Sequence, residues 1–109
     1  MSTILDTLSF SNGIEVIPYF CRVERNGTSI KLTNCEMRIL LTFLWKKETN
    51  QEVNQEELLE CIVSYSDTID FKKLRNNLHV HIRRLRKKIQ KLNMLLICKS
   101  ILVYQIKIN

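Results

Sequence analysis

The residues best suited to binding chemistry lie together in segment 72–91, which holds nine lysines and arginines and no carboxylate. Exposed helices usually alternate glutamate with lysine about one turn apart, because each such pair stabilises the helix slightly. This segment lacks such pairs, so its cations repel one another. A polyanion relieves that repulsion and releases counterions. The segment therefore indicates a nucleic-acid partner in preference to an ordinary solvated face.

The same segment carries a regular apolar stripe at spacings of three and four residues, which predicts a helix over about 71–92 with one buried face. The stripe consists of Leu74, Leu78, Ile82, Leu85, Ile89 and Leu92. The residues expected opposite it are Asn77, His81, Arg84 and Lys88, flanked by Lys73 and Val80. The pattern thus separates a core face from a face that is free to bind.

Several of the outward residues have side chains that recognise base edges or phosphates. Arg84 can bridge O6 and N7 of guanine, Asn77 can pair in the same way with adenine, and Val80 can touch a thymine methyl group. The cations expected to grip phosphates are Arg83, Arg86, Lys87 and Lys88. Together they predict a helix that lies in the major groove of duplex DNA.

Composition and charge support one small globular domain with a polarised surface. The chain has 109 residues, 45% of them apolar, with two glycines and one proline, which favours a single domain with one core. All eleven acids lie in residues 1–70 beside six basic residues, whereas residues 71–109 hold eleven basic residues and no acid. The two parts therefore carry about −5 and +11, an asymmetry that favours a polyanion-facing surface.

Other chemistries find little support in the sequence. His79 and His81 stand two residues apart on the predicted helix and point about 200° away from each other, so they cannot share a metal ion. No paired nucleophile and base, GxSxG motif or glycine-rich phosphate loop occurs. We expect no catalysis, metal, cofactor or small-molecule substrate.

Cysteine and apolar usage predict an intracellular protein with a reduced core. Cys21, Cys35, Cys61 and Cys98 form no CxxC unit, and each has apolar neighbours, so all four are expected to be buried thiols. No secretory signal or membrane-spanning run is present, and a cytoplasmic location is expected. The core is expected to include Leu40, Phe43 and Trp45.

Turn and capping signals place the remaining elements. Asn26-Gly27 between alternating runs predicts a two-residue hairpin turn. Two capping boxes, Thr33 with Glu36 and Asn54 with Glu57, predict helices at about 34–47 and 55–64, and Asp70 is expected to cap the basic helix. Two β-rich runs, 94–98 and 102–108, predict a final hairpin that turns at Lys99-Ser100.

This order of elements predicts an α+β fold of the winged helix-turn-helix type. We expect one domain over 1–109, with an N-terminal antiparallel sheet over 1–32, a three-helix core over 33–93 and a C-terminal β-hairpin wing over 94–109.

Three stretches then carry a family resemblance. NNLHVHIRRLRKKI resembles the recognition-helix signature of the OmpR/PhoB-type transcriptional regulators, IKLTNCEMRILLTFL is similar to their strand and first helix, and VNQEELLECI resembles their second helix. The resemblance spans about residues 5–108. It implies a bacterial DNA-binding effector domain that binds paired sites as a homodimer. It also implies RNA polymerase as a partner, with the loop at 64–69 as the contact.

The resemblance also implies contact positions and a domain order. The family's DNA contacts fall on Asn76, Val80, His81, Arg83, Arg84 and Arg86, and in the wing on Lys99 and Tyr104. The family's wing glycines are missing from CKSILVY, so minor-groove readout by this wing is not expected. Because the first predicted strand begins close to Met1, we expect an excised domain or a stand-alone or membrane-anchored relative, similar to ToxR and CadC in domain order.

The sequence predicts a sequence-specific transcriptional regulator that binds double-stranded DNA. One alternative is a basic RNA- or nucleoid-binding module with little sequence preference. A second is a protein-interaction domain that pairs with a related regulator and blocks it.

Overall fold

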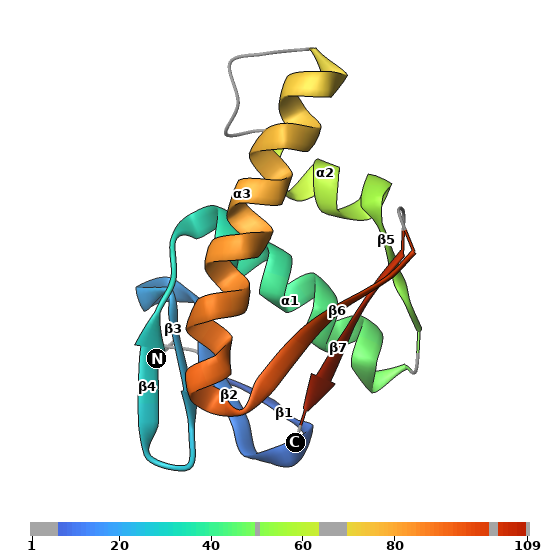
Figure 1. The fold of residues 1–109 in the computed structure, drawn as a ribbon. Coiled ribbons are helices and arrows are strands. Elements are labelled where there is room, and N and C mark those ends of the chain that lie inside the picture. The colour runs from blue at the N-terminus through green and yellow to red at the C-terminus, as the bar shows by residue number, and fades with distance from the viewer. Residues whose placement is uncertain (1–6, 50, 64–69, 101–102, 109) are drawn as a thin grey trace, which may run out of the picture.

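The computed structural model describes residues 7–49, 51–63, 70–100 and 103–108. Within them the chain forms a four-stranded sheet, three α-helices and a second, three-stranded sheet (Figure 1). The loop at 64–69, which the family resemblance suggested as a polymerase contact, lies outside the described residues.

The N-terminal sheet contains β1 (Leu8–Phe10), β2 (Ile14–Ile17), β3 (Arg22–Arg25) and β4 (Thr28–Lys31), each antiparallel to the next. Short 3₁₀ turns, η1 (Ser11–Gly13) and η2 (Pro18–Phe20), join the first three strands. Asn26 and Gly27 connect β3 to β4 with φ of 50° and 81°, left-handed conformations that asparagine and glycine adopt most easily. The predicted hairpin turn is confirmed.

Three helices follow: α1 (Asn34–Glu48), α2 (Gln55–Val63) and α3 (Phe71–Ile89), the last extended by the 3₁₀ turn η3 (Gln90–Leu92). Each begins where its capping residue predicted. The Thr33 hydroxyl accepts a hydrogen bond from the backbone N–H of Glu36 at 3.2 Å, and the Asn54 side chain accepts one from that of Glu57 at 2.9 Å. The Asp70 carboxylate accepts from the Lys72 backbone N–H at 2.9 Å. Local capping chemistry therefore determines where all three helices start.

The C-terminal sheet differs from the prediction in two respects. Strand β6 (Met94–Ser100) pairs with β7 (Val103–Ile108), so Lys99 and Ser100 belong to a strand, and the turn predicted there is wrong. A register shift between Cys98 and Ser100 accommodates the longer strand. A further short strand that sequence analysis missed, β5 (Val53–Asn54), pairs with β7 and gives the order β5-β7-β6.

One hydrophobic core joins both sheets and all three helices. Phe43 and Leu40 lie in it as predicted, but Trp45 is 54% exposed, so its assignment to the core was wrong. Trp45 contacts the ring of Phe10 at a centroid distance of 6.3 Å on the outer side of α1. The cysteine prediction holds for two residues only. Cys35 and Cys61 are buried, whereas Cys21 is half-buried and Cys98 is exposed.

The arrangement confirms the predicted α+β winged-helix fold, with its N-terminal antiparallel sheet, three helices and C-terminal hairpin. In Figure 1, α3 is the longest element and runs from α2 at its N-terminal end toward the N-terminal sheet at its C-terminal end. None of the helices in the described residues is long and apolar enough to cross a membrane.

Candidate nucleic-acid interface

The buried face of α3 is the predicted stripe. Its five helical members, Leu74, Leu78, Ile82, Leu85 and Ile89, are each at most 5% exposed, and Leu92 in η3 is 2% exposed. This face packs against α1, α2 and β6. The core therefore holds α3 along its whole length and leaves its other sides to solvent.

The exposed strip of α3 lies one position away from the predicted one. At 100° per residue, the line directly opposite the buried face runs through Asn76, Val80, Arg83 and Lys87. Apart from half-buried Val80, these residues are exposed, and Lys73 and Arg84, which flank the line, are exposed as well. The same strip is free of carboxylates over its full length. It is the most strongly cationic helix face in the described residues.

The line predicted to lie opposite the core, Asn77, His81, Arg84 and Lys88, instead lies on a flank. Asn77 and Arg84 are exposed, but His81 and Lys88 are half-buried, and the Lys88 ammonium lies 2.6 Å from the Glu36 carboxylate in α1. The prediction that these four residues face straight outward was therefore wrong. The reason is that the buried stripe is centred near Leu78, and at 100° per residue the predicted line lies about 90° from that centre, beside the stripe and not opposite it.

Glu36 is a completely buried carboxylate at the start of α1. Burial has the largest single effect on its pKa and raises it. The hydrogen bonds from Lys88 and Thr33 and the attraction of the Lys88 charge together outweigh burial, and they hold the pKa of Glu36 below its ordinary value. Glu36 is therefore ionised at neutral pH, and the Lys88 charge is already engaged within the protein.

His81 is a poor candidate for a charged DNA contact. Burial lowers the pKa of the imidazole; the nearby Glu36 carboxylate opposes that effect and the Arg84 guanidinium adds to it, so the pKa lies below its ordinary value. At neutral pH His81 is therefore predominantly the uncharged imidazole, which donates a hydrogen bond through one ring nitrogen and accepts one through the other.

A groove of about 330 Å³ separates α3 from the wing. Its lining residues are His79, Ile82, Arg83, Arg86, Cys98 and Tyr104. The Nε atom of Arg86 is buried and has no hydrogen-bond partner among the described residues. Tyr104 is only 5% exposed and forms a wall of the groove, so it is not positioned as the surface contact that the family resemblance implied. The groove offers two guanidinium groups to an anion.

Lys99 lies in β6 and carries an ion pair with Glu52, which precedes β5. Both side chains are nearly half exposed, so the pair is weak and open to competition. Sequence analysis missed Glu52 as a partner because it stands 47 residues from Lys99.

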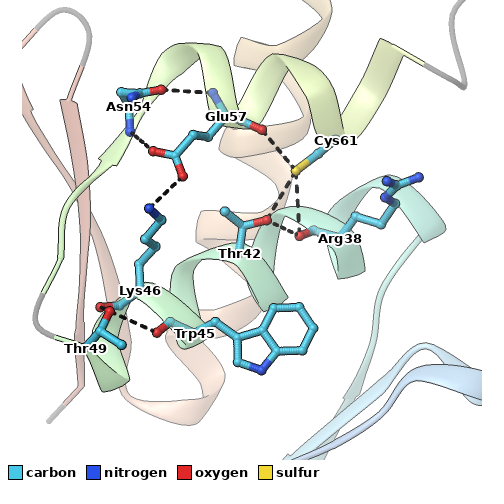
Figure 2. Close-up of polar contacts among 8 residues, drawn as sticks. All are labelled: Arg38, Thr42, Trp45, Lys46, Thr49, Asn54, Glu57 and Cys61. Carbon is cyan, nitrogen blue, oxygen red and sulfur yellow. Dashed lines mark hydrogen bonds and ion pairs between the residues drawn. The ribbon is translucent and has the colours of Figure 1, made fainter.

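The second helix is fastened to the first by a small polar network, drawn in Figure 2. The Glu57 carboxylate accepts from the Asn54 backbone N–H at 3.4 Å and pairs with Lys46 of α1 at 3.0 Å. The Cys61 thiol lies 3.3 Å from the Thr42 hydroxyl and donates to the backbone carbonyl of Glu57 at 3.4 Å. These contacts hold α2 against α1, so the pair forms a fixed support for α3.

The C-terminal end of α3 is tied to the N-terminal sheet. Arg25, which is 8% exposed in β3, donates to the backbone carbonyls of Leu92 at 2.8 Å and Asn12 at 3.0 Å. A cation at a helix C-terminus satisfies carbonyls that lack partners within the helix. The basic helix is thus held at its far end as well as along its buried face.

Comparison with known proteins identifies the family. The family model described as transcriptional regulatory protein, C terminal, matches residues 27–97. This chain belongs to that family. The match runs from the β3–β4 turn through α3 into β6, so it contains the whole helix-turn-helix unit and its exposed cationic face.

A solved structure agrees with this assignment. The C-terminal domain of the nisin resistance regulator NsrR, described as a lantibiotic response regulator, is 26% identical and superposes with a TM-score of 0.67. The similarity covers 90% of this chain and 94% of that domain. No curated protein sequence matches the chain.

The family match and the structural match together show that the chain is a sequence-specific DNA-binding transcriptional regulator of OmpR/PhoB type, with the winged-helix fold of a response-regulator C-terminal domain.

Proposed function

We propose that this transcriptional regulator reads its operator with the exposed strip of α3 in the major groove of double-stranded DNA. The proposal rests on the composition of this strip, in which cations stand beside side chains able to contact base edges and no carboxylate lies between them. The proposed readers are Asn76, Asn77, Val80, His81 and Arg84. A helix of 19 residues is long enough to keep these readers in the groove while its ends reach the phosphate backbones.

The phosphate contacts are proposed on the strip and beside it. Lys73, Arg83, Arg86 and Lys87 are the proposed grips, and Arg83 and Arg86 share the groove beside the wing. Lys99 is proposed as a further, weaker contact, since DNA has to compete with Glu52 for its charge. Lys88 and Tyr104 are left out because one is engaged by Glu36 and the other is buried.

The remaining assignments rest on the family. We propose a single domain over 1–109, a homodimer on paired DNA sites, contact with RNA polymerase, no enzymatic activity and a cytoplasmic location. The family match supports these assignments, because its members are transcriptional regulatory domains.

Selection of random duplexes on the purified protein tests the proposal. A sequence-specific binder should enrich one motif and hold it at roughly 10³-fold or more over mixed-sequence duplex. Arg84→Ala should then relax preference at one base pair, at a cost of roughly 1–3 kcal/mol, while Lys87→Ala weakens all duplexes alike. Enrichment of no motif would instead support a basic RNA- or nucleoid-binding module.

Mixing with a related regulator tests the remaining alternative. If the chain were a protein-interaction domain that blocks that regulator, it should form a stable mixed complex and reduce the regulator's DNA binding without binding DNA itself. Independent binding of both proteins to DNA would exclude that role.

A further inference from the structure

The contact between Glu36 and Lys88 joins the first turn of α1 to the last turn of α3, across 52 positions in the sequence. Glu36 Oε1 accepts from the Lys88 ammonium at 2.6 Å and from the Thr33 backbone N–H at 2.8 Å. Its second oxygen, Oε2, is buried without a partner among the described residues. Among the described residues, Lys88 is therefore the one cation paired with this carboxylate, and it binds Oε1.

The two helix ends reinforce this pair electrostatically. The N-terminus of α1 carries partial positive charge and favours the Glu36 carboxylate, whereas the C-terminus of α3 carries partial negative charge and favours the Lys88 ammonium. Each helix end therefore stabilises the charged side chain that it carries. If α3 rotated or slid, the ammonium would leave a carboxylate that is 0% exposed, and a buried charge without its partner is costly.

The apolar face of α3 places a weaker restriction on its position. Its buried side chains are all leucine and isoleucine, whose dispersion contacts have no preferred direction. A buried ion pair adds little net stability over an apolar pair of similar shape, but it is directional. The contribution of Glu36 and Lys88 is therefore expected to lie in the position of α3 more than in stability.

We propose that Glu36 is a positioning residue for DNA recognition, which sets the base preference of α3 through Lys88 without touching DNA. Val80, Arg83, Arg84 and Lys87 all precede Lys88 within two and a half turns, so a change in its anchor moves each of them relative to the bases. The inference rests on the proposed function, because it assumes that α3 reads the operator.

The test compares two adjacent lysines that differ in environment. Lys88→Met keeps the apolar stem and removes the charge from the ion pair, and Lys87→Met makes the same change at an exposed position. Both variants are assayed for the ranking of selected duplexes, for the slope of log affinity against log salt, and for the urea midpoint.

Lys87→Met is expected to reduce the salt slope by about 0.9 and to leave the site ranking unchanged, as loss of one phosphate contact requires. Lys88→Met should leave the slope unchanged and reduce the ratio of best site to single-base variants by about tenfold. If Lys88→Met instead reduces the slope and preserves the ranking, Lys88 is a phosphate contact and the proposal is overturned.

Variants at the carboxylate separate positioning from folding. Glu36→Gln keeps a side chain that can complete the capping box with Thr33, but it removes the charge that binds Lys88. It should lose site preference to the same extent as Lys88→Met, and the double variant should lose no more than either single variant. Lys88→Arg, which keeps a positive charge at this position, should retain part of the site preference that Lys88→Met loses.

The outcomes also distinguish this proposal from the function on which it depends. If the unchanged protein enriches no motif, the proposed function fails, and no loss of preference can be measured. If the unchanged protein has a motif and Glu36→Gln lowers only the urea midpoint, the ion pair is structural and the positioning role is refuted.

Discussion

The salt dependence of DNA binding follows directly from the cations that the fold leaves free. On α3, Lys72, Lys73, Arg75, Arg83 and Lys87 are exposed, and Arg86 opens into the groove beside the wing. Lys88 and Lys99 are excluded from this set because each is paired with a carboxylate, and exposed Arg84 is excluded because it is proposed to contact a base. The structure therefore predicts about six neutralised phosphates.

Six neutralised phosphates should give a slope of log affinity against log salt near −5, from about −0.9 for each. Raising the salt from about 50 to 200 mM should then weaken binding roughly a thousandfold. The measurement is a fluorescence anisotropy titration of a labelled duplex at five or six potassium chloride concentrations.

The control is Lys31→Met, at an exposed lysine of β4 outside α3. It should leave the slope unchanged, whereas Lys73→Met should make it shallower by about 0.9. A slope shallower than about −2 for the unchanged protein would refute docking through α3, and an equal effect of both variants would show that the bound surface extends to the N-terminal sheet.

Three further outcomes are expected from the packing and the titrating groups. Phe43→Ala should lower the free energy of unfolding in urea by about 3–5 kcal/mol, whereas Trp45→Ala, on the exposed side of α1, should lower it by about 1 kcal/mol. Equal losses of stability would contradict the difference in burial between the two side chains. Ile106→Asp should unfold the protein by circular dichroism, because Ile106 is 2% exposed on the buried side of β7; a folded variant would place that side in solvent. The pKa values of His81 and Glu36 lie below their ordinary 6.5 and 4.5, so the unfolded chain takes up protons before the folded protein does as the pH falls. The urea midpoint should therefore decrease below about pH 6.5 and again below about pH 4.5. A midpoint that rises on acidification would contradict both shifts.

Features that depend on neighbours in the sequence were predicted well. Thr33 with Glu36 and Asn54 with Glu57 mark helix starts because each pair closes a hydrogen-bonded ring within three residues. Asn26-Gly27 marks a hairpin turn because the two residues tolerate left-handed φ. The apolar period of α3 identified its buried face, and these local signals together were enough to establish the winged-helix order of elements.

Features that depend on distant parts of the chain were predicted poorly. Trp45 is apolar and lies one turn beyond Leu41, but its exposure depends on how α1 turns against the sheets and α2. Strand β5 has two residues and exists only because β7 lies beside it, so no local pattern marks it. The end of β6 was misplaced because a register shift lets the strand continue through Lys99 and Ser100.

The sequence by itself determined that a basic helix with one apolar face would present its cations to a polyanion, because charge and periodicity are both properties of the segment. Only the tertiary structure decided which of those cations remain available. Lys87 and Lys88 are adjacent and chemically identical, yet one is exposed and the other meets a buried carboxylate from α1. Glu36 was recognised as the capping-box partner of Thr33 from its spacing, but its contact with Lys88 exists because packing of the core brings the two helix ends together.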